Sequence, residues 1–257
     1  MKNTFVISCP IDTYSGYGSR SRDLVKALIN LDKYDVKILP QRWGNTPWNF
    51  IEDHNEEWGF LVPHILQGQM TQQPDIWAQI TVPNEFQPVG KYNIGITAGI
   101  ETTICAPQWI EGMNRMNLNL VSSEHSKKVF QDSKFQKKDD KTNQIVGNVE
   151  LIAPIEVLFE GVDITKYFQT VLTPTSEISQ ALDIIEEDFT FLFVGHWLQG
   201  DFGQDRKDVS GLIRVFLETF KNKKKKPALV LKTMSGPASI TDRGQILKKI
   251  DILIERT

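Results

Sequence analysis

The chain has 257 residues, 40% of them hydrophobic and 24% charged, a composition typical of a globular protein with a sizeable core. Its 29 lysines and arginines against 32 aspartates and glutamates give a formal charge of -3, which excludes a general electrostatic attraction to nucleic acid or membrane. The two cysteines, Cys9 and Cys105, stand far apart without metal-ligand spacing, so neither a disulfide framework nor a zinc site is expected. No window reaches the roughly 20 apolar residues of a membrane-spanning helix, and we expect a cytoplasmic protein without a transmembrane segment.

Short β-branched or aromatic runs alternate with amphipathic stretches, a pattern typical of βα units on a parallel sheet. The first helix is expected from Ser19 to Leu31, with leucines on one face and Arg20 and Arg22 turned away from that face. Strands are expected in the first part of the chain at residues 4–8, 34–39, 76–82, 91–98, 117–123 and 151–159.

Two irregular stretches interrupt this alternation. Residues 41–74 form an elaborated insertion that carries Trp43, Trp48 and Trp58. Exposed tryptophans near a cleft can stack on a sugar ring, but large aromatics in a long loop more often anchor that loop to the core, which is the interpretation we favour. The second stretch, residues 136–150, is polar and rich in turn-forming residues.

The same order of elements begins again near residue 189. A strand at residues 189–195, a polar loop, a helix at 209–222, a strand at 227–233 and a final amphipathic stretch follow one another. We therefore predict a Rossmann-like domain at residues 1–170, a linker at 171–187 and an incomplete second Rossmann-like domain at 188–257. The lysine-rich run at 221–226 lies between a helix and a strand, where cations are usually solvated, so nucleic-acid binding is not expected.

Glycines stand at two strand-to-helix junctions, where a loop can receive a phosphate or simply turn. Gly16 and Gly18 precede the first helix, and backbone N–H groups at such a place can point at an anion. The third glycine of the dinucleotide fingerprint is missing, so a plain tight turn is an equally good interpretation. After Gly195, Arg206 and Lys207 precede a helix and could neutralise a diphosphate, or be ordinary solvated residues.

Polar residues also follow the third and fourth expected strands. Asn84 and Glu85 come after one strand, and Glu101 and Thr102 come after the next. Because the carboxyl ends of parallel strands form ligand crevices, Asn84, Glu85 and Glu101 are candidates for contact with an acceptor or a sugar. Glu101 could equally cap a turn.

Four phrases in the chain resemble the family 4 group of retaining glycosyltransferases with the GT-B fold. They are GYGSRSRDLVKAL, WIEGMNRMNLNLVSSEHSKKVF, IEVLFEGVDITKYF and FLFVGHWLQGDFGQDRKDVSGLIRVFLETF, and their order extends the resemblance along nearly the whole chain. The resemblance implies transfer of a sugar from a nucleotide-sugar to a saccharide or other hydroxyl acceptor, with retention of configuration. It implies no cofactor beyond the nucleotide-sugar as co-substrate, and no metal.

The resemblance also implies roles for particular residues. Gly16 and Gly18 match the family's N-terminal loop near the donor phosphates and the acceptor, and Gly195 matches the first strand of the second domain. His196 replaces the family's diphosphate-binding arginine, a loss for which Arg206 or Lys207 could compensate. Lys232 is a further basic candidate for the diphosphate, and Glu101 and Thr102 are the candidates for a catalytic role. In the EGVD phrase, Glu160 replaces the family's asparagine.

The family's spaced pair of glutamates in the donor-binding half has no counterpart before Thr257. We therefore expect a truncated enzyme that is inactive alone. The competing hypothesis is a non-catalytic α/β module that binds a carbohydrate or a partner. A nicotinamide-dependent dehydrogenase is disfavoured because neither glycine loop completes the dinucleotide fingerprint.

Overall fold

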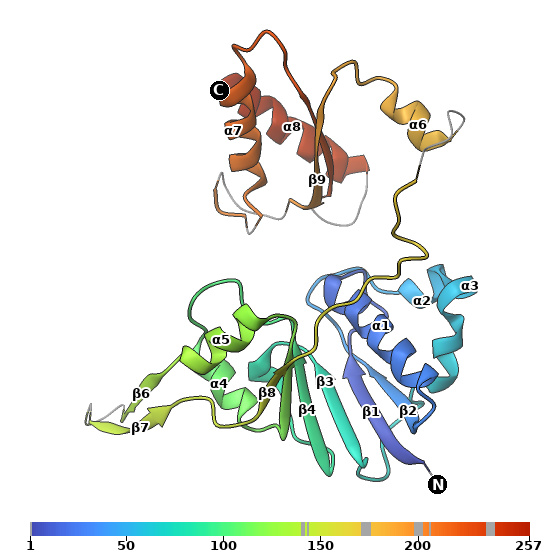
Figure 1. Cartoon of the computed structure of the whole chain (residues 1–257), viewed down its shortest axis with the longest axis vertical. Coiled ribbons are helices and arrows are strands. Elements are labelled where there is room, and N and C mark those ends of the chain that lie inside the picture. The colour runs from blue at the N-terminus through green and yellow to red at the C-terminus, as the bar shows by residue number, and fades with distance from the viewer. Residues whose placement is uncertain are drawn as a thin grey trace. The chain divides into compact units, whose positions relative to one another are not determined.

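The structure is a computed structural model of the chain. It describes residues 2–139, 142, 144–170, 176–197, 203–205, 207–234 and 240–257. These divide into two compact units, Met1–Asp163 and Ile164–Thr257 (Figure 1). The domain and linker boundaries given above stay a prediction.

The first unit is built on a parallel sheet of six strands in the order β2-β1-β3-β4-β5-β8. Each expected strand is present, with bounds that differ by a few residues. The strands are β1 (Asn3–Cys9), β2 (Tyr34–Pro40), β3 (Ile76–Ile80), β4 (Tyr92–Thr97), β5 (Leu118–Val121) and β8 (Ile155–Val157).

Helices cover both faces of this sheet (Figure 1). Successive residues of β1 alternate, with Phe5 and Ile7 in one apolar cluster and Val6 in the other. Burial on both faces explains the continuous apolar run in β1. One cluster includes residues of α1 (Gly16–Asn30), α2 (Phe50–Asp53) and α3 (Asn55–Trp58), and the other includes residues of α4 (Pro107–Met113) and α5 (Glu124–Asp132).

The tryptophan-rich insertion packs on the first unit, as expected. Trp58 is only 9% exposed and belongs to the apolar cluster beside α1. Trp43 is half-buried, and Trp48 lies under the guanidinium of Arg42, whose carbon is 4.5 Å from the ring centroid. Two short 3-10 helices, Gly59–His64 and Pro83–Glu85, complete the connections.

The polar stretch at 136–150 differs from the expectation. It contributes to an antiparallel hairpin of β6 (Phe135–Lys138) and β7 (Ile145–Val149), which forms a separate two-stranded sheet (Figure 1). All residues of β7 except Val149 are exposed. Because neither face of the strand is buried, its sequence lacks the apolar–polar alternation by which a strand is recognised.

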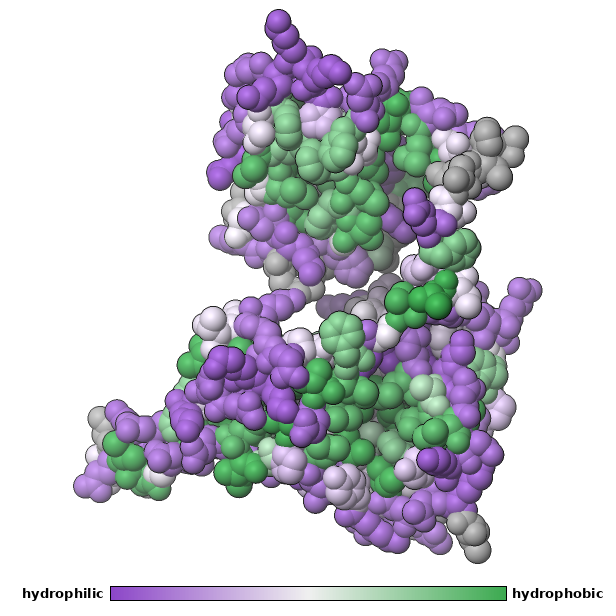
Figure 2. Space-filling view, in the orientation of Figure 1, coloured by the Kyte–Doolittle hydropathy of each residue, from purple (hydrophilic) through white to green (hydrophobic). Residues whose placement is uncertain are grey.

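The second unit contains α6 (Glu177–Leu182), β9 (Thr190–His196), α7 (Val209–Phe220), β10 (Ala228–Met234) and α8 (Ile240–Arg256). The two strands pair in parallel, and residues such as Phe193, Leu229 and Leu231 pack toward a core formed with α7 and α8. Leu192 and Val194 are 66% and 63% exposed, and Figure 2 shows apolar residues reaching the surface of this unit.

Cys9 lies at the end of β1 with no exposed surface, and burial raises the pKa of its thiol from 9.0 to about 12. Above pH 9 the unfolded chain therefore releases a proton that the folded chain retains, so stability falls as the pH rises toward 12. Relative to a Cys9→Ala variant, we expect the wild type to lose up to about 1.4 kcal/mol of unfolding free energy per pH unit in this window. Urea titrations of both proteins between pH 8 and 10.5 measure the difference, and a pH-independent difference would contradict the assignment.

Candidate functional site

The candidate site lies at the carboxyl edge of the six-stranded sheet. The chain passes from β1 through α1 to β2 on one side, whereas β3 pairs with β1 on its other side. Such a change of direction is a topological switch point, where open α/β sheets hold their ligands. The N-terminus of α1 and the ends of β3, β4, β5 and β8 therefore surround one place.

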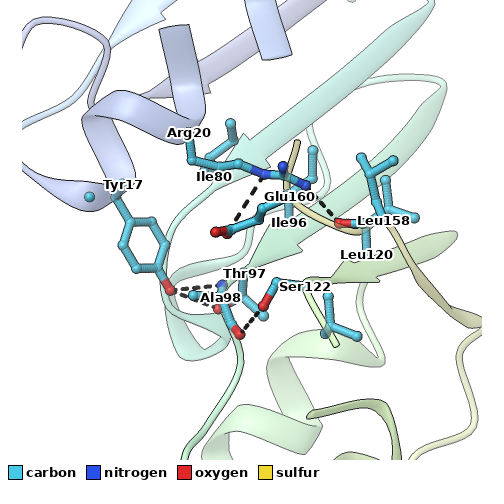
Figure 3. Close-up of a pocket in the computed structure, with 12 residues that line it drawn as sticks. Tyr17, Arg20, Ile80, Ile96, Thr97, Ala98, Leu120, Ser122, Leu158 and Glu160 are labelled. Carbon is cyan, nitrogen blue, oxygen red and sulfur yellow. Dashed lines mark hydrogen bonds and ion pairs between the residues drawn. The ribbon is translucent and has the colours of Figure 1, made fainter. Parts of the chain in front are cut away.

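A cavity of about 190 Å³ occupies this place (Figure 3). It is smaller than the roughly 300–1,000 Å³ of a pocket that holds a drug-sized ligand, so its volume suits a molecule of about one ring. Aliphatic side chains and a few polar groups line it: Gly16, Tyr17, Arg20, Ile80, Ile96, Thr97, Ala98, Leu120, Val121, Ser122, Leu158 and Glu160.

Tyr17 is held on one side of this pocket by three contacts. Its hydroxyl lies 3.0 Å from Thr97 Oγ1 and accepts a hydrogen bond of 3.1 Å from the backbone N–H of Ala98. Its ring stacks on Trp43, with centroids 3.9 Å apart and planes 22° apart. The Ser122 hydroxyl donates to the Ala98 carbonyl at 2.9 Å, so this wall of the pocket is a connected polar network (Figure 3).

Arg20 and Glu160 form the opposite part of the pocket (Figure 3). The Arg20 guanidinium donates from Nη2 to the Leu158 carbonyl at 2.7 Å and from Nη1 to the Phe159 carbonyl at 3.5 Å. Its Nε lies 3.9 Å from Glu160 Oε1. The sequence pattern did turn Arg20 away from the apolar face of α1, but it did not indicate that this side chain reaches the segment after β8.

The two N-terminal glycines have different surroundings. Helix α1 begins at Gly16, capped by Ser15, whose hydroxyl accepts from the Gly18 N–H at 2.9 Å. A Cβ on Gly16 would meet nothing within 4 Å, whereas one on Gly18 would lie 2.3 Å from the Thr13 carbonyl oxygen. Gly16 is one of the residues that line the pocket, and the absence of a side chain at Gly18 is explained by the close packing of the helix on the loop before it.

The candidates in the second unit lie in several settings. Gly195 is within β9, opposite Thr233, as the expected strand at 189–195 predicts. Lys207 is exposed just before α7, and its backbone N–H donates to Asp205 Oδ1 at 3.1 Å. Lys232 is exposed on β10, in register with Val194. Arg206 lies outside the described residues.

The polar residues after β3 and β4 are not among those that line the pocket. Asn84 and Glu85 are exposed in the 3-10 helix after β3, and the Glu85 carboxylate accepts a short hydrogen bond from Thr81 Oγ1. Glu101 and Thr102 lie in an exposed loop, where the Thr102 hydroxyl donates to the Ile104 carbonyl at 2.8 Å. The structure thus brings Gly16 to the pocket but places these four elsewhere on the surface of the unit.

Tyr17, Arg20, Ser122 and Glu160 line the pocket without having been predicted as site residues. A signal was present for the first two, since Gly16, Tyr17 and Arg20 fall on one side of the first turns of a helix. Within the described parts of the chain, no three histidines, cysteines or acidic residues are grouped so as to hold a metal ion. No helix there has the length and apolar character needed to cross a membrane.

Comparison with known proteins supports the fold. No protein-family profile and no curated protein sequence matches the chain. Among solved structures, the apo structure of OtsA aligns with a TM-score of 0.51 at 12% identity, over 98% of this chain and 70% of that one. The α,α-trehalose 6-phosphate synthase of Burkholderia multivorans aligns with a TM-score of 0.50 at 8% identity, over 100% of this chain and 70% of its own. The chain has a GT-B-like α/β fold.

Proposed function

We propose that the chain belongs to a glycosyltransferase that moves a sugar from a nucleotide-sugar to a hydroxyl acceptor with retention. The observation that carries this proposal is the pocket at the carboxyl edge of the first sheet, in a fold similar to that of a trehalose 6-phosphate synthase. Hydroxyl, carboxylate and guanidinium groups beside aliphatic side chains suit a pyranose, which has polar edges and apolar faces. In this proposal the pocket holds the acceptor or the transferred sugar.

The proposal assigns the donor diphosphate to the second unit. Negative charge develops on the leaving diphosphate in the transition state, so fixed cations nearby lower the barrier. Arg206 and Lys207, just before α7, and Lys232 on β10 are the proposed cations, with Gly195 allowing close approach. Gly16 and Gly18 remain the proposed diphosphate contacts from the first unit. Close packing against Thr13 also explains, without any ligand, why residue 18 is a glycine.

The test uses titration calorimetry of the full chain with uridine, guanosine and adenosine diphosphate sugars. The double variant Arg206→Ala, Lys207→Ala is expected to weaken nucleotide-sugar binding at least about ten-fold, because two cations that neutralise phosphate are lost. Its melting temperature is expected to stay within about 2 °C of the wild type, because the exposed charge of Lys207 contributes little to stability.

The matched control is Lys223→Ala, Lys224→Ala, which removes the same charge from the exposed run after α7. If both double variants bound the nucleotide-sugar equally well, the assignment of Arg206 and Lys207 to the diphosphate would be wrong. Failure of the wild type to bind any of the nucleotide-sugars, or tight binding of a nicotinamide dinucleotide instead, would overturn the proposed function.

A further inference from the structure

The Glu160 carboxylate lines the pocket with hydrogen-bonding capacity to spare. Its side chain is 52% exposed, and among the described residues its one ion-pair partner is Arg20, at 3.9 Å from Oε1. An ionised carboxylate has two oxygens and only accepts hydrogen bonds. The side chain therefore offers acceptors to a molecule in the pocket that supplies donors.

Arg20 holds this carboxylate without covering it. Both terminal nitrogens of the guanidinium donate to backbone carbonyls, those of Leu158 and Phe159, which immediately precede Glu160. The Arg20 side chain is only 18% exposed, and its planar group fixes the backbone from which Glu160 projects. A long-range contact of this kind, from the first helix to the segment after β8, sets where the carboxylate lies relative to the pocket.

The charge of the pair selects the kind of ligand. Because Arg20 already places a positive charge beside the carboxylate, a second cation such as a sugar ammonium gains less attraction here than at an isolated carboxylate. Two neighbouring hydroxyl groups, in contrast, donate one hydrogen bond to each carboxylate oxygen or both to one of them. The aliphatic side chains of Ile80, Ile96 and Leu120 line the same cavity and provide apolar surface for a ring.

We infer that Glu160 is a specificity-determining residue that recognises a vicinal diol of a neutral pyranose, and that Arg20 is its positioning residue. The inference rests on the proposed function, since it names the part of the sugar that the proposed sugar pocket recognises. It requires that removal of one hydroxyl from the bound sugar weakens binding only while the Arg20–Glu160 pair is intact.

The experiment measures binding of the methyl α-glycosides of glucose, galactose and mannose, and of their 2-, 3- and 4-deoxy analogues, to the full chain by ligand-observed NMR. We expect the deoxy analogues that lack a hydroxyl of the recognised pair to bind the wild type about ten-fold more weakly than the parent glycoside. Glu160→Ala is expected to weaken the parent about ten-fold and to abolish the discrimination.

Positioning by Arg20 has its own readout, the ratio of parent to deoxy affinity. Arg20→Ala is expected to reduce this ratio nearly to one, and Arg20→Lys to restore part of it because the positive charge beside the carboxylate returns. The control is Glu255→Ala, which removes an exposed carboxylate that does not line the pocket and should leave the ratio unchanged. Circular dichroism of each variant verifies that it is folded.

The outcomes separate the two proposals. Binding of a glycoside with no dependence on any hydroxyl pair, or discrimination that survives in Glu160→Ala, overturns the inference and leaves the sugar pocket in place. A preference for methyl glucosaminide that Glu160→Ala removes also overturns it, in favour of ammonium recognition. No binding of any sugar or nucleotide-sugar by the folded wild type rejects the proposed function and, with it, the inference.

Discussion

Replacing Gly18 by alanine is expected to lower the free energy of unfolding by about 2 kcal/mol, the order of cost found when atoms are forced into a well-packed site. The new Cβ would lie 2.3 Å from the Thr13 carbonyl oxygen and 3.0 Å from that of Pro10, and both are backbone atoms. Only a shift of α1 or of the loop before it can relieve such contacts. Urea denaturation followed by tryptophan fluorescence measures the loss.

The matched control is Gly16→Ala in the same helical turn. A Cβ at Gly16 meets nothing within 4 Å, so the substitution is expected to be neutral or to stabilise the helix by up to about 1 kcal/mol. If Gly16→Ala and Gly18→Ala lost the same stability, a general requirement for glycine in this turn would explain both losses. The packing explanation for Gly18 would then be wrong.

Arg22→Ala is expected to destabilise the chain by about 3 kcal/mol, through loss of hydrogen bonds to a charged group and of buried packing. Arg22 is 4% exposed, and its Nη1 donates to the carbonyls of Ile11 at 2.8 Å and Thr13 at 3.0 Å. Its guanidinium carbon lies 3.5 Å from the centroid of the Phe50 ring. Burial lowers the pKa of Arg22 from 12.5 to about 10, which leaves the group charged at neutral pH.

Two further variants make the Arg22 test specific. Arg22→Lys keeps the charge but not the flat stacking surface, so it should lose about half as much stability. Arg214→Ala, at an exposed position in α7, should change the free energy of unfolding by no more than about 0.5 kcal/mol. If Arg22→Ala lost as little unfolding free energy as the control, the buried guanidinium would not stabilise the loop that contains Ile11 and Thr13.

The fold was predictable where burial imposes a period on the sequence. β1 is buried on both sides, and its apolar run identified it. The amphipathic pattern of α1 was also informative, but it placed Arg22 outside the core, and this was wrong. The aromatic cover over Arg22 comes from Phe50 in an insertion without periodicity, and no local pattern connects the two segments.

The site was predictable in its location more than in its residues. The rule for parallel sheets indicated the carboxyl edge, and the pocket lies there. The same rule nominated Asn84 and Glu85, but a 3-10 turn after β3 directs the Glu85 carboxylate back to Thr81. Glu160 belongs to a segment far along the chain, and its approach to Arg20 depends on how β8 joins the sheet, which the sequence does not state.

The hairpin of β6 and β7 gives the first unit a place where its length can change. β5 and β8 are adjacent in the six-stranded sheet although the hairpin lies between them in the chain. The hairpin forms a separate sheet and contributes no strand to the larger one. The entropic free-energy cost of closing such a loop grows only with the logarithm of its length, by about 0.6 kcal/mol for each doubling. Insertions into the hairpin are therefore expected to cost little stability as long as Phe135 and Val149 keep their packing against the apolar cluster beside α4 and α5.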